Sequence, residues 1–189
     1  MANIQLQNFN KKITQQETQQ YLRQVLGERS GQFINNLVAL VANSEQLQRC
    51  EPMSVMFSAI KATALELPLD PALGFAYVIP YNDSKSGTTL AQFQIGAKGF
   101  KQLALRTGLF KTINESDVRD GEIVSQNRLS GEIEFAWIQD EAERESKKIV
   151  GYVSYFELTN GFRSVYYKSI ESLEKHGKKY SQTYKKGLS

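Results

Sequence analysis

Residues 89–108, TLAQFQIGAKGFKQLALRTG, begin with a strand pattern and end with a helix pattern. In the first part, Gln92 and Gln94 alternate with apolar residues, which places the two amides on one face of a strand. In the second part, apolar residues recur at helical spacing. The segment in between, residues 96–99 with the sequence GAKG, predicts a glycine-punctuated turn from strand to helix.

This turn has the composition of an anion site. The first amides of a helix have no intrahelical acceptor, a lysine in the first turn adds a positive charge, and glycine lets a ligand approach the backbone. The spacing matches neither a nucleotide P-loop nor a dinucleotide-binding fingerprint. From the residues alone, two interpretations stay open: a phosphate-binding turn, or a tight connection between strand and helix.

The predicted helix has two different faces at about 100° per residue. The face expected to contact a core holds Ala97, Phe100, Leu103 and Ala104. The opposite face holds Lys98, Lys101, Gln102 and Arg106. Together with the two strand glutamines, these residues form a polar and cationic row that suits a sugar–phosphate backbone.

The segments on either side predict an α+β protein. Helical patterns cover residues 14–28, a second helix from Ser30, and a third from Pro52 to about residue 66. The apolar run 74–80 predicts a buried central strand, paired with residues 88–95 in a hairpin. We expect residues 1–30 to be a polar tail with a first helix, and residues 31–189 to be one core domain.

Downstream, strand patterns occur at residues 110–113, 122–124 and 132–138, followed by a charged loop. Asn160-Gly161 predicts a hairpin with a two-residue turn, which would place Tyr155 opposite Tyr166. Ser169 is placed to cap a last helix. The predicted fold therefore has N-terminal helices and antiparallel hairpins, or a small twisted sheet, packed on a central helix.

Charge is spread unevenly over the 189 residues, although the formal net charge is only +3. Four bases and no acid lie between residues 98 and 111, and seven bases face two acids from residue 163 onward. Residues 115–145 hold ten acids and three bases. The basic blocks can contact a polyanion or be ordinary solvated faces, and the acidic block can face away or meet a neighbouring subunit.

Few residues suit catalysis or metal binding. Cys50 and His176 are the only residues of their types. A single cysteine fits a reducing compartment, so we expect a cytoplasmic protein with a buried thiol. No metal-ligand spacing surrounds the histidine, which we expect on an exposed basic face. The predictions are therefore no metal, no cofactor and no enzymatic activity.

Four segments of the chain read LPLDPALGFAYVIPY, AQFQIGAKGFKQLALRTGLFKTIN, VGYVSYFELTNGFRSVYY and KHGKKYS. Together they resemble the RecT family of phage single-strand annealing proteins, the RecT/Redβ group. The resemblance runs from about Phe33 to the C-terminus, and its most specific part is the string F-Q-I-G-x-K-G followed by L-A-x-R-T-G.

The resemblance implies a RecT/Redβ-like fold and the activity of a phage recombination protein. Such proteins bind single-stranded DNA and anneal it to its complement without ATP, as rings or helical filaments, beside a phage exonuclease in the bacterial host cell. Carried over by motif, the DNA-binding residues are Gln92, Gln94, Lys98, Lys101, Gln102, Arg106, Lys178 and Lys179, of which Lys101 stands where relatives often have an apolar residue.

Relatives continue beyond the point where this sequence stops, so we expect part of the family fold and a partner-binding tail to be absent. Two alternatives to an annealing protein follow. One is a shortened structural or regulatory subunit that co-assembles without annealing. The other is a metal-dependent nuclease using Asp117, Asp120 and Glu122, which would need these carboxylates to cluster.

Overall fold

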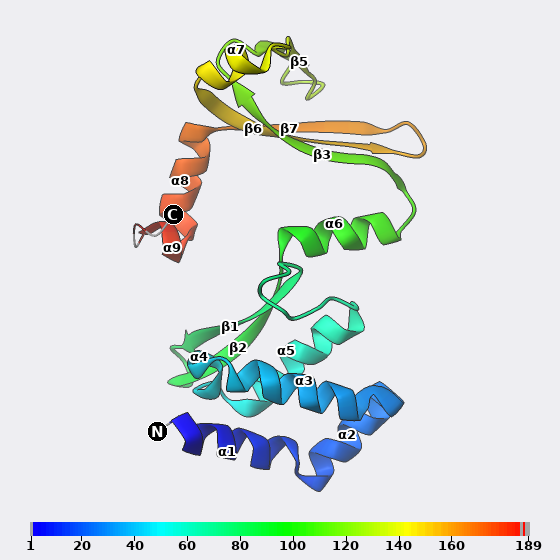
Figure 1. Cartoon of the computed structure of the whole chain (residues 1–189), viewed down its shortest axis with the longest axis vertical. Coiled ribbons are helices and arrows are strands. Elements are labelled where there is room, and N and C mark those ends of the chain that lie inside the picture. Colours follow the sequence, from blue (N-terminus) through cyan, green and yellow to red (C-terminus); the bar gives the residue numbers. More distant parts are fainter. Residues whose placement is uncertain (1, 186, 188–189) are drawn as a thin grey trace. The chain divides into compact units, whose positions relative to one another are not determined.

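The computed structural model describes residues 2–185 and 187, and it falls into two compact units, Met1–Leu103 and Ala104–Ser189 (Figure 1). Lys186 of the second basic block lies outside the described residues. Helices come first and small antiparallel sheets follow, which confirms the predicted α+β class. Within the described residues, no helix is long and apolar enough to cross a membrane.

The first unit contains helices, a hairpin and most of a further helix. Its helices are α1 (Ala2–Ile13), α2 (Gln16–Leu26), a short 3₁₀ turn (Gly27–Arg29), α3 (Ser30–Ala42), α4 (Glu45–Gln48) and α5 (Pro52–Ala64). The hairpin consists of β1 (Ala76–Asp83) and β2 (Thr88–Ile95), and α6 (Ala97–Arg106) follows directly.

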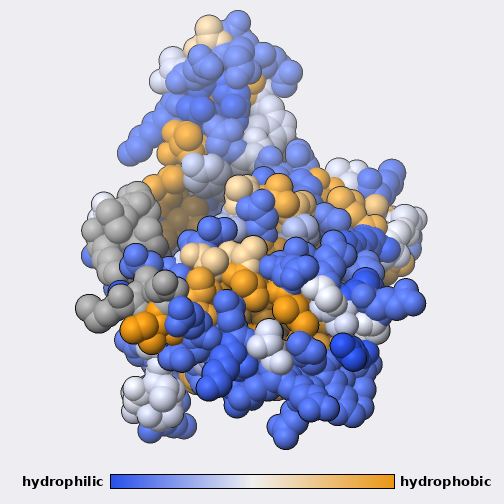
Figure 2. All heavy atoms as spheres, turned by 60° about the horizontal axis from the view of Figure 1, so that its bottom comes forward, coloured by the Kyte–Doolittle hydropathy of each residue, from blue (hydrophilic) through white to orange (hydrophobic). Residues whose placement is uncertain are grey.

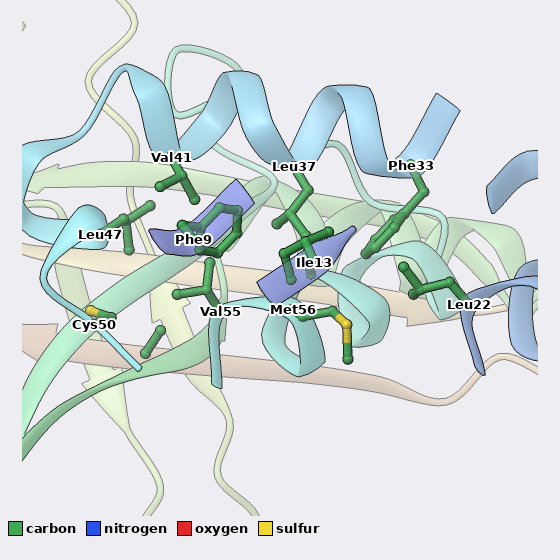
Figure 3. Close-up of a cluster of buried hydrophobic side chains, with 12 residues drawn as sticks. Phe9, Ile13, Leu22, Phe33, Leu37, Val41, Leu47, Cys50, Val55 and Met56 are labelled. Atoms are coloured by element: carbon green, nitrogen blue, oxygen red, sulfur yellow. The ribbon is translucent and has the colours of Figure 1, made fainter. Parts of the chain in front are cut away.

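The core of the first unit is built by the helices (Figure 3). Helix α3 contributes Phe33, Leu37 and Val41, one residue per turn, as the sequence periodicity predicts. They pack with residues from other helices: Phe9, Ile13, Leu22, Leu47, Val55, Met56 and Ala59. Cys50 joins this cluster and is 4% exposed. Its burial raises the pKa of the thiol, which confirms an ordinary buried cysteine.

Helix α1 corrects the expectation of a polar N-terminal tail. Phe9 and Ile13 are 1% and 0% exposed, so this helix supplies two of the most buried side chains of the unit. Gln5, Gln7 and Asn8 are exposed on its outer face. Leu6 is a further, partly buried residue that packs against the core.

Helix α5 begins where the sequence predicts and covers one edge of the hairpin. Pro52 occupies its first turn, and the Glu51 carboxylate caps it by accepting bonds from the amides of Met53 and Ser54. The Ser54 hydroxyl accepts from the Ala91 amide at 2.9 Å, and Ser58 donates to the Ala91 carbonyl at 3.2 Å. The helix therefore satisfies backbone groups that an edge strand leaves unpaired.

The run at residues 74–80 was predicted as a buried central strand, and this is wrong. Strand β1 belongs to a sheet of two strands. One face carries Ala76 and Val78 toward the core, whereas Ile79 and Tyr81 on the other face are 41% and 44% exposed. Continuous hydrophobicity here reflects one buried face and one open face that is itself apolar and aromatic.

The second unit contains a sheet in the order β3–β6–β7, a smaller β4–β5 pair and further helices. The elements are β3 (Phe110–Arg119), β4 (Ile123–Gln126), β5 (Ile133–Phe135), α7 (Glu141–Ser146), β6 (Ile149–Leu158), β7 (Arg163–Ser169), α8 (Ile170–Tyr180) and α9 (Gln182–Lys185). The charged loop expected near residues 140–148 contains α7, which the Asp140 side chain caps. Ser169 caps α8, as predicted.

The β6–β7 hairpin lies where Asn160-Gly161 predicts it, but its register differs by one residue. Residues 159–161 form a three-residue loop in which Gly161 has φ +86°, a conformation that favours glycine. Tyr166 therefore pairs with Ser154, and Tyr155 pairs with Val165. The prediction that Tyr155 faces Tyr166 is wrong, and the two rings lie on opposite faces of the sheet.

A partly buried ion network holds the end of β3 to the segments after it. Glu122 is fully buried and accepts from the amide of Arg119 at 2.6 Å and from Nε of Arg144 at 3.1 Å. Asp117 accepts from Nη2 of Arg144 at 2.7 Å and from Nε of Arg119 at 2.6 Å. Because buried carboxylates need such partners, the four side chains fix α7 against β3.

The visible surface in Figure 2 is mostly hydrophilic, with apolar side chains gathered toward its middle. Large exposed apolar or aromatic residues of the first unit include Tyr21, Val25 and Phe57. The rings of Tyr21 and Phe57 meet edge to face with centroids 6.1 Å apart.

We expect Asp117→Asn to lower the free energy of unfolding of the second unit by about 1–3 kcal/mol at neutral pH, the order of a hydrogen bond to a charged group. Hydrogen bonding to Arg144 lowers the pKa of Asp117. A carboxyl whose pKa is lowered by folding stabilises the fold above its unfolded pKa of about 3.9 and loses that contribution below it. The difference between wild type and variant should therefore shrink below about pH 4.

Denaturation followed by the fluorescence of Trp137, the single tryptophan, measures this unit. The control is Asp120→Asn, which removes an exposed carboxylate that has no side-chain partner among the described residues and should change stability by less than about 0.5 kcal/mol. Equal effects of the two variants would contradict a structural role for the network.

Candidate nucleic-acid interface

The open face of the β1–β2 hairpin carries both predicted glutamines. Gln94 pairs with Tyr77, and Gln92 pairs with Ile79. Residues directly opposite each other in an antiparallel pair project to the same face, so these four side chains are neighbours. Both glutamines are exposed, while Ala91 and Val78 project to the core side. The predicted alternation of β2 is confirmed.

The glycines of the turn at 96–99 serve the protein's own packing. A Cβ on Gly96 would lie 2.2 Å from the Gly74 carbonyl oxygen, and one on Gly99 would lie 2.1 Å from that of Phe75. The Gly96 amide donates to the Phe75 carbonyl at 2.9 Å. Glycine is therefore required because α6 lies against the backbone before β1. From the sequence, we interpreted these glycines as residues that let a ligand approach the backbone. In the structure, they let α6 pack against the backbone of Gly74 and Phe75.

Lys98 lies in the first turn of α6 and next to the glutamine face. A Cβ on Gly74 would lie 3.6 Å from Cδ of Lys98 and 3.4 Å from the Tyr77 hydroxyl, so both side chains flank this glycine. Tyr77 is the cross-strand partner of Gln94. The lysine side chain is exposed, and its ammonium makes no ion pair with any described residue. A free cation thus adjoins a row of amides and a tyrosine hydroxyl.

Helix α6 does not bury the arc that the sequence predicts. Phe100 is 61% exposed and Ala97 is also exposed, whereas Gly99 is buried. Because the helix contacts the Phe75 backbone through Gly99, the predicted apolar arc is turned partly outward. Lys101 and Gln102, expected on the solvent side, are half-buried.

The remaining cations of the first basic block are less available. Lys101 and Arg106 already take part in interactions within the chain, although Arg106 is exposed. Lys111 forms an ion pair with Glu157 at 2.8 Å, which raises the pKa of Lys111 and lowers that of Glu157. Lys98 is therefore the residue of this block best placed to meet a phosphate.

The second predicted segment lies on α8 in the second unit, where Lys178 and Lys179 are exposed. The ammonium of Lys179 lies 5.0 Å from the ring centroid of Tyr180, which is 61% exposed. His176 is exposed and packs against the same ring at 4.7 Å, as expected for a residue of a basic face. This segment combines cations with an open aromatic ring.

Two of the three carboxylates considered for a nuclease are engaged elsewhere. Asp117 and Glu122 bind arginines in the ion network, and their oxygens are thereby occupied. Among the described residues, no group of three His, Cys, Asp or Glu side chains could hold a metal ion. This arrangement gives no support to metal-dependent strand cleavage.

Tyr77 was not predicted as part of the interface. The signal lies in the hairpin register, because a residue on β1 that pairs with Gln94 must share its face. Its pairing with Gln94 in particular depends on the loop, which spans residues 84–87.

A family model described as RecT family matches residues 31–188. One relative is the protein named "Uncharacterized protein YqaK" of Bacillus subtilis (strain 168), which is 44% identical over 160 residues, covering 85% of this chain and 53% of the relative. "Protein RecT" of Escherichia coli (strain K12) is 33% identical over 78 residues, covering 40% of this chain and 29% of that protein. The chain thus spans about half the length of the Bacillus relative.

We expect Gly99→Ala to destabilise the first unit by about 1–3 kcal/mol, since the added methyl overlaps the Phe75 carbonyl and the helix must shift. The matched control is Gly31→Ala in α3, where a Cβ meets nothing within 4 Å. That change should be neutral or stabilise by up to about 1 kcal/mol. Thermal unfolding of both variants measures the difference, and an unaffected Gly99 variant would contradict the packing role.

Proposed function

Because this chain belongs to the RecT family, we propose that it binds single-stranded DNA and anneals it to a complementary strand in homologous recombination. The chain would act on phage or host DNA in the bacterial cytoplasm, as an oligomer and without ATP. It would bind and assemble, and break no covalent bond.

The observation that carries this proposal is the position of Lys98. Its exposed ammonium, in the first turn of α6, adjoins the face that carries Gln94 and Tyr77. The first amides of the helix point toward the same end and favour an anion. This combination suits the sugar–phosphate backbone, because amides, a hydroxyl and a cation position a strand without reading its sequence.

The proposed mechanism uses charge neutralisation and pairing. Gln92 and Gln94 would contact sugar and phosphate oxygens, and Lys98 would neutralise a phosphate. With the backbone held in this way, the bases stay free to pair with an incoming strand. Since duplex formation is itself favourable, the protein needs only to reduce repulsion between strands and hold them together. Lys101, Gln102, Arg106, Lys178 and Lys179 remain proposed DNA contacts.

The proposal also includes three kinds of partner. A single strand and a nascent duplex are the ligands, further copies of the chain form the oligomer, and a phage exonuclease supplies single-stranded ends. The exonuclease contact would belong to a region that relatives have in addition to the part matched here.

The first test adds two complementary labelled oligonucleotides one after the other, without ATP, over a series of salt concentrations. We expect the protein to accelerate annealing and the effect to weaken as salt rises, because bound counterions are released from the strand on binding. Binding without annealing would favour the co-assembling subunit, and mixing the chain with a longer relative should then lower that relative's annealing rate. Absence of binding would overturn the proposal.

Lys98→Ala should weaken binding to single strands of any sequence about tenfold at low salt, the loss expected for one charge-assisted hydrogen bond of about 1.5 kcal/mol. The slope of log affinity against log salt should fall by about 0.7 to 1. The control is Lys12→Ala, which removes an exposed lysine from α1. Equal effects of the two variants would mean that only net charge matters, and would contradict the assigned site.

A further inference from the structure

The β3–β6–β7 sheet has one covered face and one open face. On the covered face, Val153 and Tyr155 line a cavity of about 330 Å³ beneath β4–β5. Phe135 and Trp137 also line this cavity, with their rings stacked at 4.6 Å. None of these four residues lies on the open face, whose exposed tyrosines have no assigned role.

Two tyrosines and a lysine stand together on the open face. Tyr152 pairs with Lys168, and Ser154 pairs with Tyr166, so all four side chains project to the same side. Tyr166 is 60% exposed and Tyr152 is 48% exposed. The two rings occupy diagonal positions on adjacent strands, about 7–8 Å apart at the backbone.

The Lys168 ammonium lies 5.3 Å from the centroid of the Tyr166 ring. The Lys168 ammonium covers only part of the Tyr166 ring, so the rest of the exposed ring lies next to a positive charge. Nucleobases stack on such rings with little dependence on sequence, and the adjacent cation is placed for the phosphate. Tyr167, the next residue, differs completely, because its ring packs over Gly151 and is half-buried.

The charge around this face also suits a polyanion. Asp117 lies on the neighbouring strand with the same orientation, but two arginines already neutralise it. Glu115 on the same strand takes part in an interaction within the chain. Directly after β7, helix α8 presents Lys178 and Lys179. A protein partner would gain little from this face, since its centre offers tyrosines and a cation rather than an apolar groove.

We propose that Tyr166 and Tyr152 form a stacking platform for the bases of single-stranded DNA, with Lys168 contacting an adjacent phosphate. This inference rests on the proposed function and adds a second kind of contact to it. The hairpin and Lys98 contact the sugar–phosphate backbone, whereas the sheet face stacks against the faces of the bases and leaves their pairing edges free.

The test compares an oligothymidine strand with an abasic strand of equal length, which keeps the phosphates and lacks the bases. Tyr166→Ala should lower affinity for oligothymidine about 5- to 150-fold, the range for one lost stacked base, and leave affinity for the abasic strand unchanged. Tyr166→Phe, which keeps the ring, should bind as wild type. Tyr21→Ala, an exposed tyrosine of the first unit, is the matched control and should change neither affinity.

A wild type that binds oligothymidine, together with a Tyr166→Ala variant of unchanged affinity, would overturn the platform and leave the proposed function standing. A wild type that binds neither strand would overturn both. If the fluorescence of Trp137 shows that the Tyr166→Ala variant does not fold, the Tyr152→Ala variant is tested in its place. Photocrosslinking of a 5-iodouracil strand to wild type gives an independent readout, since crosslinks must map to residues 149–169 if the bases stack there.

Discussion

The close approach of α6 to the backbone preceding β1 is the constraint on which the first unit's surface depends. Gly96 and Gly99 lie so near the carbonyls of Gly74 and Phe75 that a side chain at either position would overlap them. The contact fixes where the helix begins relative to the hairpin. It also determines which face of α6 turns inward. The residues that make this contact are glycines, which have no side chain, and not apolar residues.

The availability of cations follows from the same packing. Four bases occur between residues 98 and 111, but Lys111 is paired with Glu157, and Lys101 and Arg106 are already engaged. Lys98 stands exposed beside Gly74 and Tyr77 because Gly99, its neighbour, is the residue against the backbone. A cation is available to a phosphate only when no acidic residue of the chain pairs with it. The number of basic residues in the sequence therefore does not predict the number of available cations.

Much of the architecture could be predicted locally, and the failures have two different causes. The apolar spacing of α3, Pro52 at the start of α5 and Ser169 at the start of α8 follow from contacts within one or two helical turns. The register of β6–β7 and the buried arc of α6 were wrong. A positive φ at Gly161 adds one residue to the loop, and a backbone contact distant in sequence turns the helix.

The sequence by itself determined the class of the fold, the alternation of Gln92 and Gln94, the sign of each charged block and the family resemblance. These depend on residue type and on neighbours a few positions away. Only the tertiary structure decided that Tyr77 joins Gln94, that the glycines serve packing, and that Tyr166 lies open beside Lys168. Such pairings depend on loop conformation and on contacts between distant segments, where a shift of one residue moves a side chain to the opposite face.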